Sequence, residues 1–145
     1  MTMRKRAIAA VLGLVTAGSA PLRAQDQAAG ASRASMVFFG WSKPEIDRDA
    51  AAILDQVVAT FAKNPASQLR IDGHSDRSGP AAPNRRTSLR RADAVRAYLA
   101  ERGVPARAMA TAGLGEDQPI IATADGVREP QNRRVEIHFA PRSAR

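Results

Sequence analysis

The sequence predicts an α+β domain in which two helices pack on one face of a four-stranded mixed sheet. Two stretches carry apolar residues at helical spacing, and four short stretches show the clustering or alternation of strands. Their order along the chain is strand, helix, strand, helix, strand, strand. A chain of 145 residues is long enough for one such domain with a modest core.

The first 24 residues have the pattern of an export signal and are not expected to be part of that fold. The basic start Arg4-Lys5-Arg6 precedes a mostly apolar run from Ala7 to Ala20, and Ala24 marks the expected cleavage before Gln25. This run is shorter than the roughly 20 residues of a membrane-spanning helix. We therefore expect a periplasmic protein of a Gram-negative-type envelope, with no membrane span after cleavage. Association with the outer membrane stays open.

Charge and composition narrow the function classes. The formal net charge is +8, and loss of the four basic residues of the signal would halve it. With no cysteine, the chain has no disulfide, no thiol catalysis and no lipid-modified cysteine. Aromatic residues make up only 4% of the chain, too few for a base-stacking platform, so no nucleic-acid partner is expected.

The first half of the domain begins after a lead-in at residues 25–35, which is rich in Ala, Gly, Ser and Gln and is expected to be flexible. Met36–Phe39 is a short apolar strand that Gly40 stops. Asp47 is a good N-cap for a helix from Arg48 to Lys63, which Asn64-Pro65 ends.

The second half of the domain, expected to end at residue 140 before a tail at 141–145, holds the other four elements. We expect strands at Leu69–Gly73, Ala108–Ala112 and Arg134–Phe139, and a helix at Asn84–Arg102. In the last strand Val135, Ile137 and Phe139 share one face, and Arg134, Glu136 and His138 share the other.

Arg91 lies on the face of its helix that must meet the sheet. At 100° per residue it falls in the same arc as Ser88 and Val95. An unpaired charge there would cost several kcal/mol, so Arg91 should have a carboxylate partner.

Asp76, which ends the Gly73-His74-Ser75-Asp76 segment, is one candidate for that partner. The periodicity does not decide between an internal Arg91–Asp76 salt bridge and two opposite charges that hold a zwitterionic ligand. As a residue at the end of a strand, Asp76 is expected to contribute little to folding.

Several sequence blocks between about Met36 and Phe139 form a recognisable series. They comprise Gly73-His74-Ser75-Asp76, Asn84, Thr87-Ser88-Leu89-Arg90-Arg91-Ala92, Gly113-Leu114-Gly115-Glu116-Asp117-Gln118-Pro119 and Asn132-Arg133-Arg134-Val135-Glu136. In their order and spacing these blocks resemble the OmpA-like C-terminal domain, a periplasmic module that binds peptidoglycan.

The resemblance implies a non-catalytic module that clasps diaminopimelate of the peptidoglycan stem peptide. Asp76 would pair with the ammonium and Arg91 with the carboxylate, Ser75 and Asn84 would join the site, and Gly40, Asn132 and Arg134 would support it. Gly40 stands where the family usually has aspartate. Thr87 and Ser75 replace the usual leucine and threonine.

Other chemistry is not favoured. His74, Ser75 and Asp76 are consecutive, so their side chains do not converge as a catalytic triad requires. His74 and His138 lack further metal ligands at suitable spacing. We expect no catalytic residue, metal or cofactor.

Three alternatives stay open at this point. Trp41 either stacks on a sugar ring or lies in the core or at the rim, and Asn132-Arg133-Arg134 either contacts peptidoglycan or forms a turn with solvent-facing arginines. The alternative to wall binding is a protein-interaction module of an envelope complex whose wall-binding site has decayed, for which Gly40 is the hint.

Overall fold

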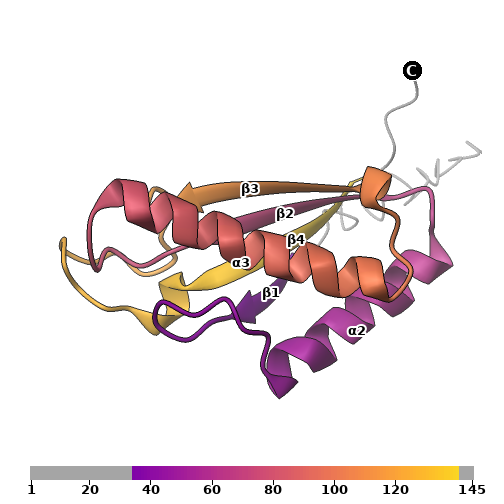
Figure 1. Ribbon diagram of the computed structural model, residues 1–145, viewed down its shortest axis with the longest axis horizontal. Coiled ribbons are helices and arrows are strands. Elements are labelled where there is room, and N and C mark those ends of the chain that lie inside the picture. The colour runs from indigo at the N-terminus through magenta and orange to yellow at the C-terminus, as the bar shows by residue number, and fades with distance from the viewer. Residues whose placement is uncertain (1–33, 141–145) are drawn as a thin grey trace, which may run out of the picture. The chain divides into compact units, whose positions relative to one another are not determined.

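The computed structural model describes residues 34–140, and four strands within them form one mixed sheet. They are β1 (Ser35–Phe38), β2 (Gln68–His74), β3 (Met109–Gly115) and β4 (Arg134–Ala140), in the spatial order β1-β4-β2-β3. β4 is antiparallel to β1 and β2, whereas β2 and β3 are parallel (Figure 1). This arrangement, with its two helices, confirms the predicted fold class.

Some predictions concern residues that the structure does not describe. The export signal at 1–24, the tail at 141–145 and nearly all of the lead-in at 25–35 lie outside the described range. These boundaries remain predictions. Within residues 34–140, no helix is long and apolar enough to cross a membrane.

The first helix, α2 (Arg48–Lys63), has the predicted bounds. Its N-cap is Asp47, whose side chain accepts a hydrogen bond of 2.8 Å from the backbone N–H of Ala50. Asn64 caps the other end through a bond from its N–H to the carbonyl of Phe61.

The second helix, α3 (Ala81–Glu101), begins three residues before the predicted start at Asn84. Pro83 falls in its first turn, where the missing N–H of a proline costs no helical hydrogen bond. The predicted start is late because proline usually breaks a helix, which favours a place for Pro83 in the preceding loop.

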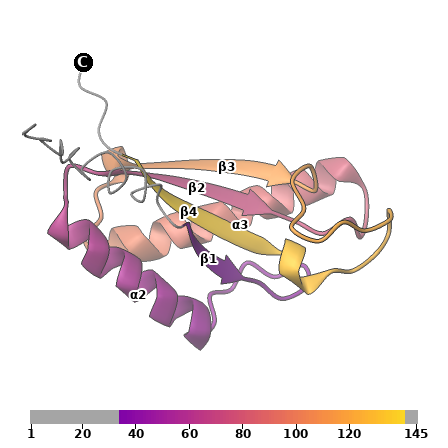
Figure 2. The same cartoon turned by 180° about the vertical axis from the view of Figure 1, so that it is seen from behind.

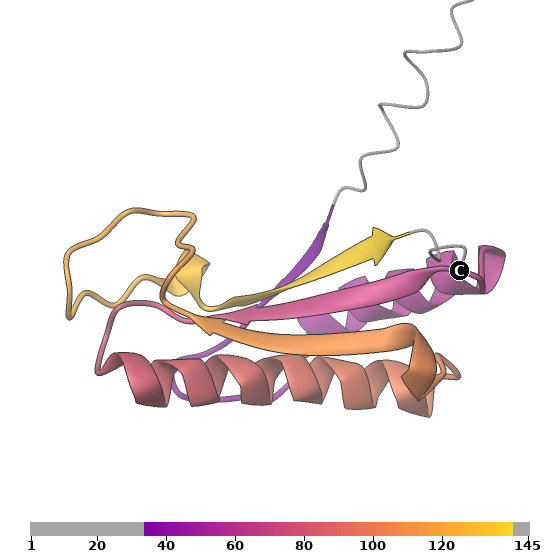
Figure 3. The same cartoon turned by 90° about the horizontal axis from the view of Figure 1, so that it is seen from above.

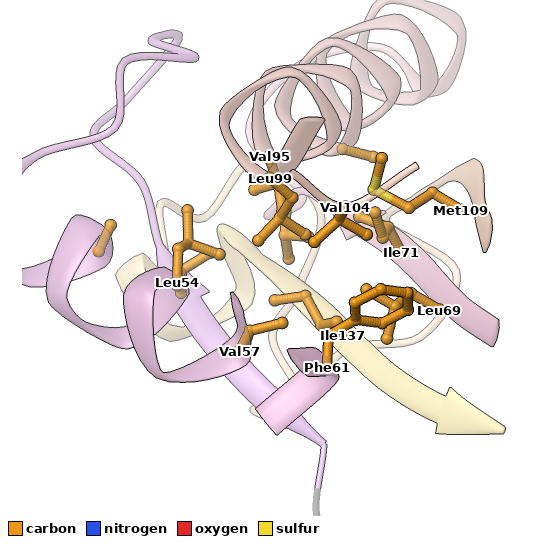
Figure 4. Close-up of a cluster of buried hydrophobic side chains, with 14 of the residues drawn as sticks. Leu54, Val57, Phe61, Leu69, Ile71, Val95, Leu99, Val104, Met109 and Ile137 are labelled. Carbon is orange, nitrogen blue, oxygen red and sulfur yellow. The ribbon is translucent and has the colours of Figure 1, made fainter. Parts of the chain in front are cut away.

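The core lies between the two helices and one face of the sheet (Figure 4). In α2, Leu54, Val57 and Phe61 point toward Ile137 of β4 and Leu69 of β2. Further core residues come from α3 and the segment after it and include Val95, Leu99, Val104 and Met109. Burial of these apolar side chains supplies the main favourable term for folding.

Gly73 of β2 and Gly113 of β3 let α3 lie directly against the backbone of the sheet. A Cβ atom at Gly73 would be 1.9 Å from the carbonyl oxygen of Ser88, and one at Gly113 would be 2.7 Å from that of Arg85. The close contact also brings the Ser88 hydroxyl to the backbone N–H of Gly115, at 2.9 Å. Figure 3 shows α3 running along the strands.

The face of the sheet turned away from α3 carries charged side chains. In the view from behind, β2, β3 and β4 lie in front of α3 (Figure 2). Arg70 pairs with Asp72 at 2.7 Å, and Arg134 pairs with Glu136 at 2.6 Å. The predicted alternation of β4 is therefore correct, because Val135 and Ile137 are buried in the core.

The two ends of the described domain lie at the same end of the sheet. Ser35, where β1 begins, is paired with Ile137, and Ala140, where β4 ends, is paired with Gln68 at the start of β2. The loops that follow β1, β2 and β3 emerge at the opposite end (Figure 1).

Candidate functional site

A pocket of about 160 Å³ lies at the end of the sheet where β1 and β2 finish and β4 begins. The first turns of α3 form one of its walls. All four residues expected to bind ligand, Ser75, Asp76, Asn84 and Arg91, are among the residues that line it. Arg133 and Trp41 also form part of its wall. The topology thus brings together side chains that are far apart in the sequence.

Arg91 is buried, with 1% of its surface exposed, but it has no carboxylate partner within the described part of the chain. Its guanidinium instead donates to three backbone carbonyl oxygens: Nη2 to Gly40 at 3.0 Å, Nη1 to His74 at 3.1 Å and Nε to Lys43 at 3.4 Å. The expected carboxylate partner is therefore absent within residues 34–140. The internal Arg91–Asp76 salt bridge, left open by the sequence, is not formed.

Arg91 remains a cation in this setting. Burial, and secondarily the positive charge of Arg133, lower its pKa to about 10, while Asp76 partly opposes that shift. The guanidinium is thus protonated at neutral pH. It has five N–H donors, of which the three carbonyls use three, so two remain for a ligand.

Asp76 is buried and accepts four hydrogen bonds. Oδ1 receives the backbone N–H and the hydroxyl of Ser78, and Oδ2 receives the backbone N–H of Glu129 at 3.2 Å and Nη1 of Arg133 at 3.0 Å. Burial alone would raise the pKa of Asp76, but the hydrogen bonds from Ser78 and Arg133 outweigh it and hold the pKa below its usual value. Asp76 is therefore an anion. It also ties three segments together, contrary to the minor role in folding expected from its place at the end of a strand.

Arg133 lines the pocket but is not among the residues predicted to bind or support the ligand. Its side chain is 12% exposed, pairs with Asp76 and also donates from Nε to the carbonyl of Phe39 at 3.2 Å. The alternation of β4 contained the signal, because Arg133 lies two residues before the core-facing Val135. Because side chains alternate between the two faces, Arg133 falls on the side of the core and Arg134 falls on the open face.

The three residues expected to support the site do not line the pocket. Arg134 lies on the open face with Glu136. Asn132 is fully buried and holds the loop between β3 and β4, accepting from the backbone N–H groups of Ile120 and Ile121 at 2.9 Å each. Gly40 contributes only its carbonyl, which accepts from Arg91.

Ser75 and Asn84 complete the pocket in different ways. The Ser75 hydroxyl is buried and has no hydrogen-bond partner among the described residues. Asn84 fixes the loop before α3: its Nδ2 donates to the carbonyls of Asp76 and Gly79 at 3.2 and 3.3 Å and to Glu116 at 2.6 Å. No side chain caps the start of α3. Helices attract anions at this end.

The histidines lie away from the pocket. His74 is buried beneath the open face, near Arg134 and 3.8 Å from Glu136, so it forms no triad with Asp76. Within residues 34–140, no three histidine or acidic side chains are placed to hold a metal ion.

His74 should make folding pH-dependent. Burial and then Arg134 lower its pKa from 6.5, and Glu136 and Asp72 oppose this only in part, with His138 a further lowering charge. Above pH 6.5 the ring is neutral in both states; below it the unfolded chain binds a proton that the folded ring resists. We expect the free energy of unfolding to fall by up to about 1.4 kcal/mol per pH unit as the pH drops.

Urea unfolding between about pH 7.5 and 5 measures that slope. His74→Leu should flatten it, because both ring nitrogens are buried without partners among the described residues. His138→Leu is the matched control, since that side chain is partly exposed. An unchanged slope in His74→Leu would contradict the assignment.

Comparison with known proteins places this geometry in a family. The profile of the OmpA family matches residues 38–133, well over half of the chain. The chain belongs to the OmpA family. The resemblance inferred from the sequence motifs is thereby confirmed.

Curated relatives are about one third identical to this chain over the regions that align. A peptidoglycan-associated lipoprotein of Rhizobium meliloti is 36% identical over 88% of this chain and 71% of its own length. One of Haemophilus influenzae is 34% identical over 74% of this chain and 70% of its own length. An outer membrane protein of Gluconacetobacter diazotrophicus is 35% identical over 73% of this chain, which spans only 30% of that protein.

Solved structures show the same OmpA-like fold. The peptidoglycan-associated lipoprotein of Burkholderia pseudomallei superposes with a TM-score of 0.68 at 26% identity, covering 73% of this chain and 90% of that one. The periplasmic domain of Helicobacter pylori MotB gives 0.60 at 19% identity, covering 73% and 71%. The MotB comparison supports the fold alone.

Proposed function

We propose that this domain binds peptidoglycan without catalysis, in the periplasm, by holding the zwitterionic end of diaminopimelate in the pocket. The observation that carries the proposal is Arg91: a buried, protonated guanidinium held by three carbonyls, with two N–H donors left over and no carboxylate of its own within the described chain. A carboxylate is the ligand that a guanidinium binds best. Relatives named peptidoglycan-associated lipoprotein support peptidoglycan as the partner.

The carboxylate of the ligand would bind Arg91 and receive a further hydrogen bond from the Ser75 hydroxyl. The ammonium would bind against Asp76. Because four donors already surround the Asp76 carboxylate, the Ser78 hydroxyl must rotate away to make room for the ligand's ammonium. The pocket wall holds two cations, Arg91 and Arg133, and one anion, Asp76, so its net charge is positive. The ligand's carboxylate should therefore contribute more to affinity than its ammonium.

The test is thermal unfolding of the domain with a soluble stem peptide that contains diaminopimelate. A ligand that binds only the folded state raises the melting temperature by mass action. The matched control is the same peptide with lysine in place of diaminopimelate, which keeps the ammonium and lacks the carboxylate. We expect a shift with the first peptide and little or none with the second.

The competing function is a protein-interaction module of an envelope complex with a decayed wall-binding site. It predicts no shift with either peptide at millimolar concentration and no retention of the domain on purified sacculi. The geometry gives this alternative no added support, because the carbonyl of Gly40 still anchors Arg91 although the family's aspartate is missing.

A further inference from the structure

Trp41 lies at the mouth of the pocket and is 52% exposed. Its indole Nε1–H donates to the Ser78 hydroxyl at 3.3 Å, and that hydroxyl donates to Asp76. Only one hydroxyl therefore separates the indole nitrogen from the carboxylate of the proposed clasp. Of the positions that the sequence left open for Trp41, the rim is the one that the structure shows.

Arg128 stacks on Trp41, with its guanidinium carbon 4.2 Å from the centroid of the ring. Within residues 34–140 Arg128 has no ion-pair partner, and its side chain is exposed. The stack and the bond to Ser78 are two independent restraints on an exposed aromatic side chain. A ring held in this way is pre-organised, so a ligand that contacts it loses little further side-chain entropy on binding.

We propose that Trp41, held by Arg128, is an apolar subsite for the aliphatic chain that joins the charged head of the ligand to the rest of the molecule. The inference rests on the proposed function. With the head between Arg91 and Asp76, we expect the methylene groups that leave the pocket to lie against Trp41, the aromatic side chain in its wall. In a stem peptide the glycan is further away, because two amino acids separate it from diaminopimelate.

The subsite would therefore select for tail length. A ligand that consists of the head alone binds between Arg91 and Asp76 and does not reach the indole. A ligand with a straight aliphatic tail also buries the apolar surface of that tail against the ring. Removal of apolar surface from water favours binding in proportion to the area buried. A short polar tail would lose this contribution.

The experiment compares three zwitterions: glycine, which is head alone; norleucine, which adds an uncharged four-carbon tail; and meso-diaminopimelate. Their affinities are measured by thermal shift for the unmutated domain, Trp41→Ala, Trp41→Phe and Phe38→Ala. Phe38 is the matched control, because it is 46% exposed and does not line this pocket. As Trp41 is the only tryptophan of the chain, its fluorescence reports binding directly in the unmutated domain.

We expect Trp41→Ala to lower the affinity for norleucine and for diaminopimelate about 5- to 20-fold. The affinity for glycine should change less than about twofold. Trp41→Phe keeps an apolar face without the N–H group and should recover most of that loss. Phe38→Ala should bind all three ligands like the unmutated domain.

Other outcomes would overturn the inference. If Trp41→Ala lowered the affinities for glycine and norleucine equally, Trp41 would act on the charged head through Ser78. A fluorescence change with N-acetylglucosamine oligomers that lack peptide, without one for norleucine, would assign the indole to the glycan. Unchanged affinities in Trp41→Ala would remove Trp41 from the site and leave the proposed function standing. Failure of all three ligands to bind the unmutated domain would reject both.

Discussion

Alanine at Asp76 or at Arg91 is expected to abolish most retention on diaminopimelate-containing peptidoglycan, with at least about a tenfold loss of affinity in each case, because each removes a charge-assisted contact. The two variants should differ in stability. Asp76→Ala leaves the Arg133 cation, 12% exposed, without its partner and is expected to cost about 3–5 kcal/mol. Arg91→Ala removes a buried charge and three hydrogen bonds to carbonyls beside an open pocket, and should cost about 1–3 kcal/mol.

Urea unfolding and a sacculus pull-down measure these two effects separately. The double variant Asp76→Ala/Arg133→Ala is the control, because it removes both members of the ion pair. It should regain part of the stability lost in Asp76→Ala and still fail to bind. Equal unfolding midpoints for Asp76→Ala and the unmutated domain would show that the pair contributes nothing to folding.

Gly73→Ala should have the largest effect on folding of any single-methyl change in the sheet. The new Cβ would lie 1.9 Å from the carbonyl oxygen of Ser88, and because both are backbone groups, no side chain can rotate away to make room. α3 would have to move off β2, at or above the upper end of the roughly 1–3 kcal/mol range for overpacking. Since the carbonyl of the next residue, His74, holds Arg91, the pocket should be distorted as well.

Circular dichroism melting of Gly73→Ala and of Gly40→Ala tests this prediction. Gly40 is the matched control: a Cβ there meets nothing closer than 3.9 Å, and its φ is not positive. Alanine at such a position should leave stability unchanged or raise it by about 0.4–1 kcal/mol through the unfolded state. Similar melting temperatures for the two variants would mean that α3 moves at little cost.

Most regular elements could be predicted closely, because they depend on short-range signals. The weak pattern at Ala108–Ala112 was the exception, since β3 continues to Gly115. Asp47 and Asn64 fixed both ends of α2, and the alternation of β4 fixed its two faces. The start of α3 was placed late because proline is read as a breaker, although it is tolerated in the first turn.

The site was predictable only as a set of residues. Asp76 and Arg91 were predicted and both line the pocket, but their partners come from segments that no local pattern connects. Arg133 reaches Asp76 across 57 positions, and Gly40 meets Arg91 across 51, through a backbone carbonyl that carries no residue signature. Asn132 and Arg134 stand on either side of Arg133 in the sequence, and neither lines the pocket.

The pocket lies at one end of the sheet, and both Ser35 and Ala140 lie at the other. In the proposed function, a pull between the ligand held in the pocket and any segment that precedes Ser35 would act along β1. Its backbone hydrogen bonds to β4 lie across that direction, so they would be loaded together in shear rather than opened one after another. The mechanical lifetime of such a link is set by the rate of unfolding under load, not by the equilibrium stability of the domain.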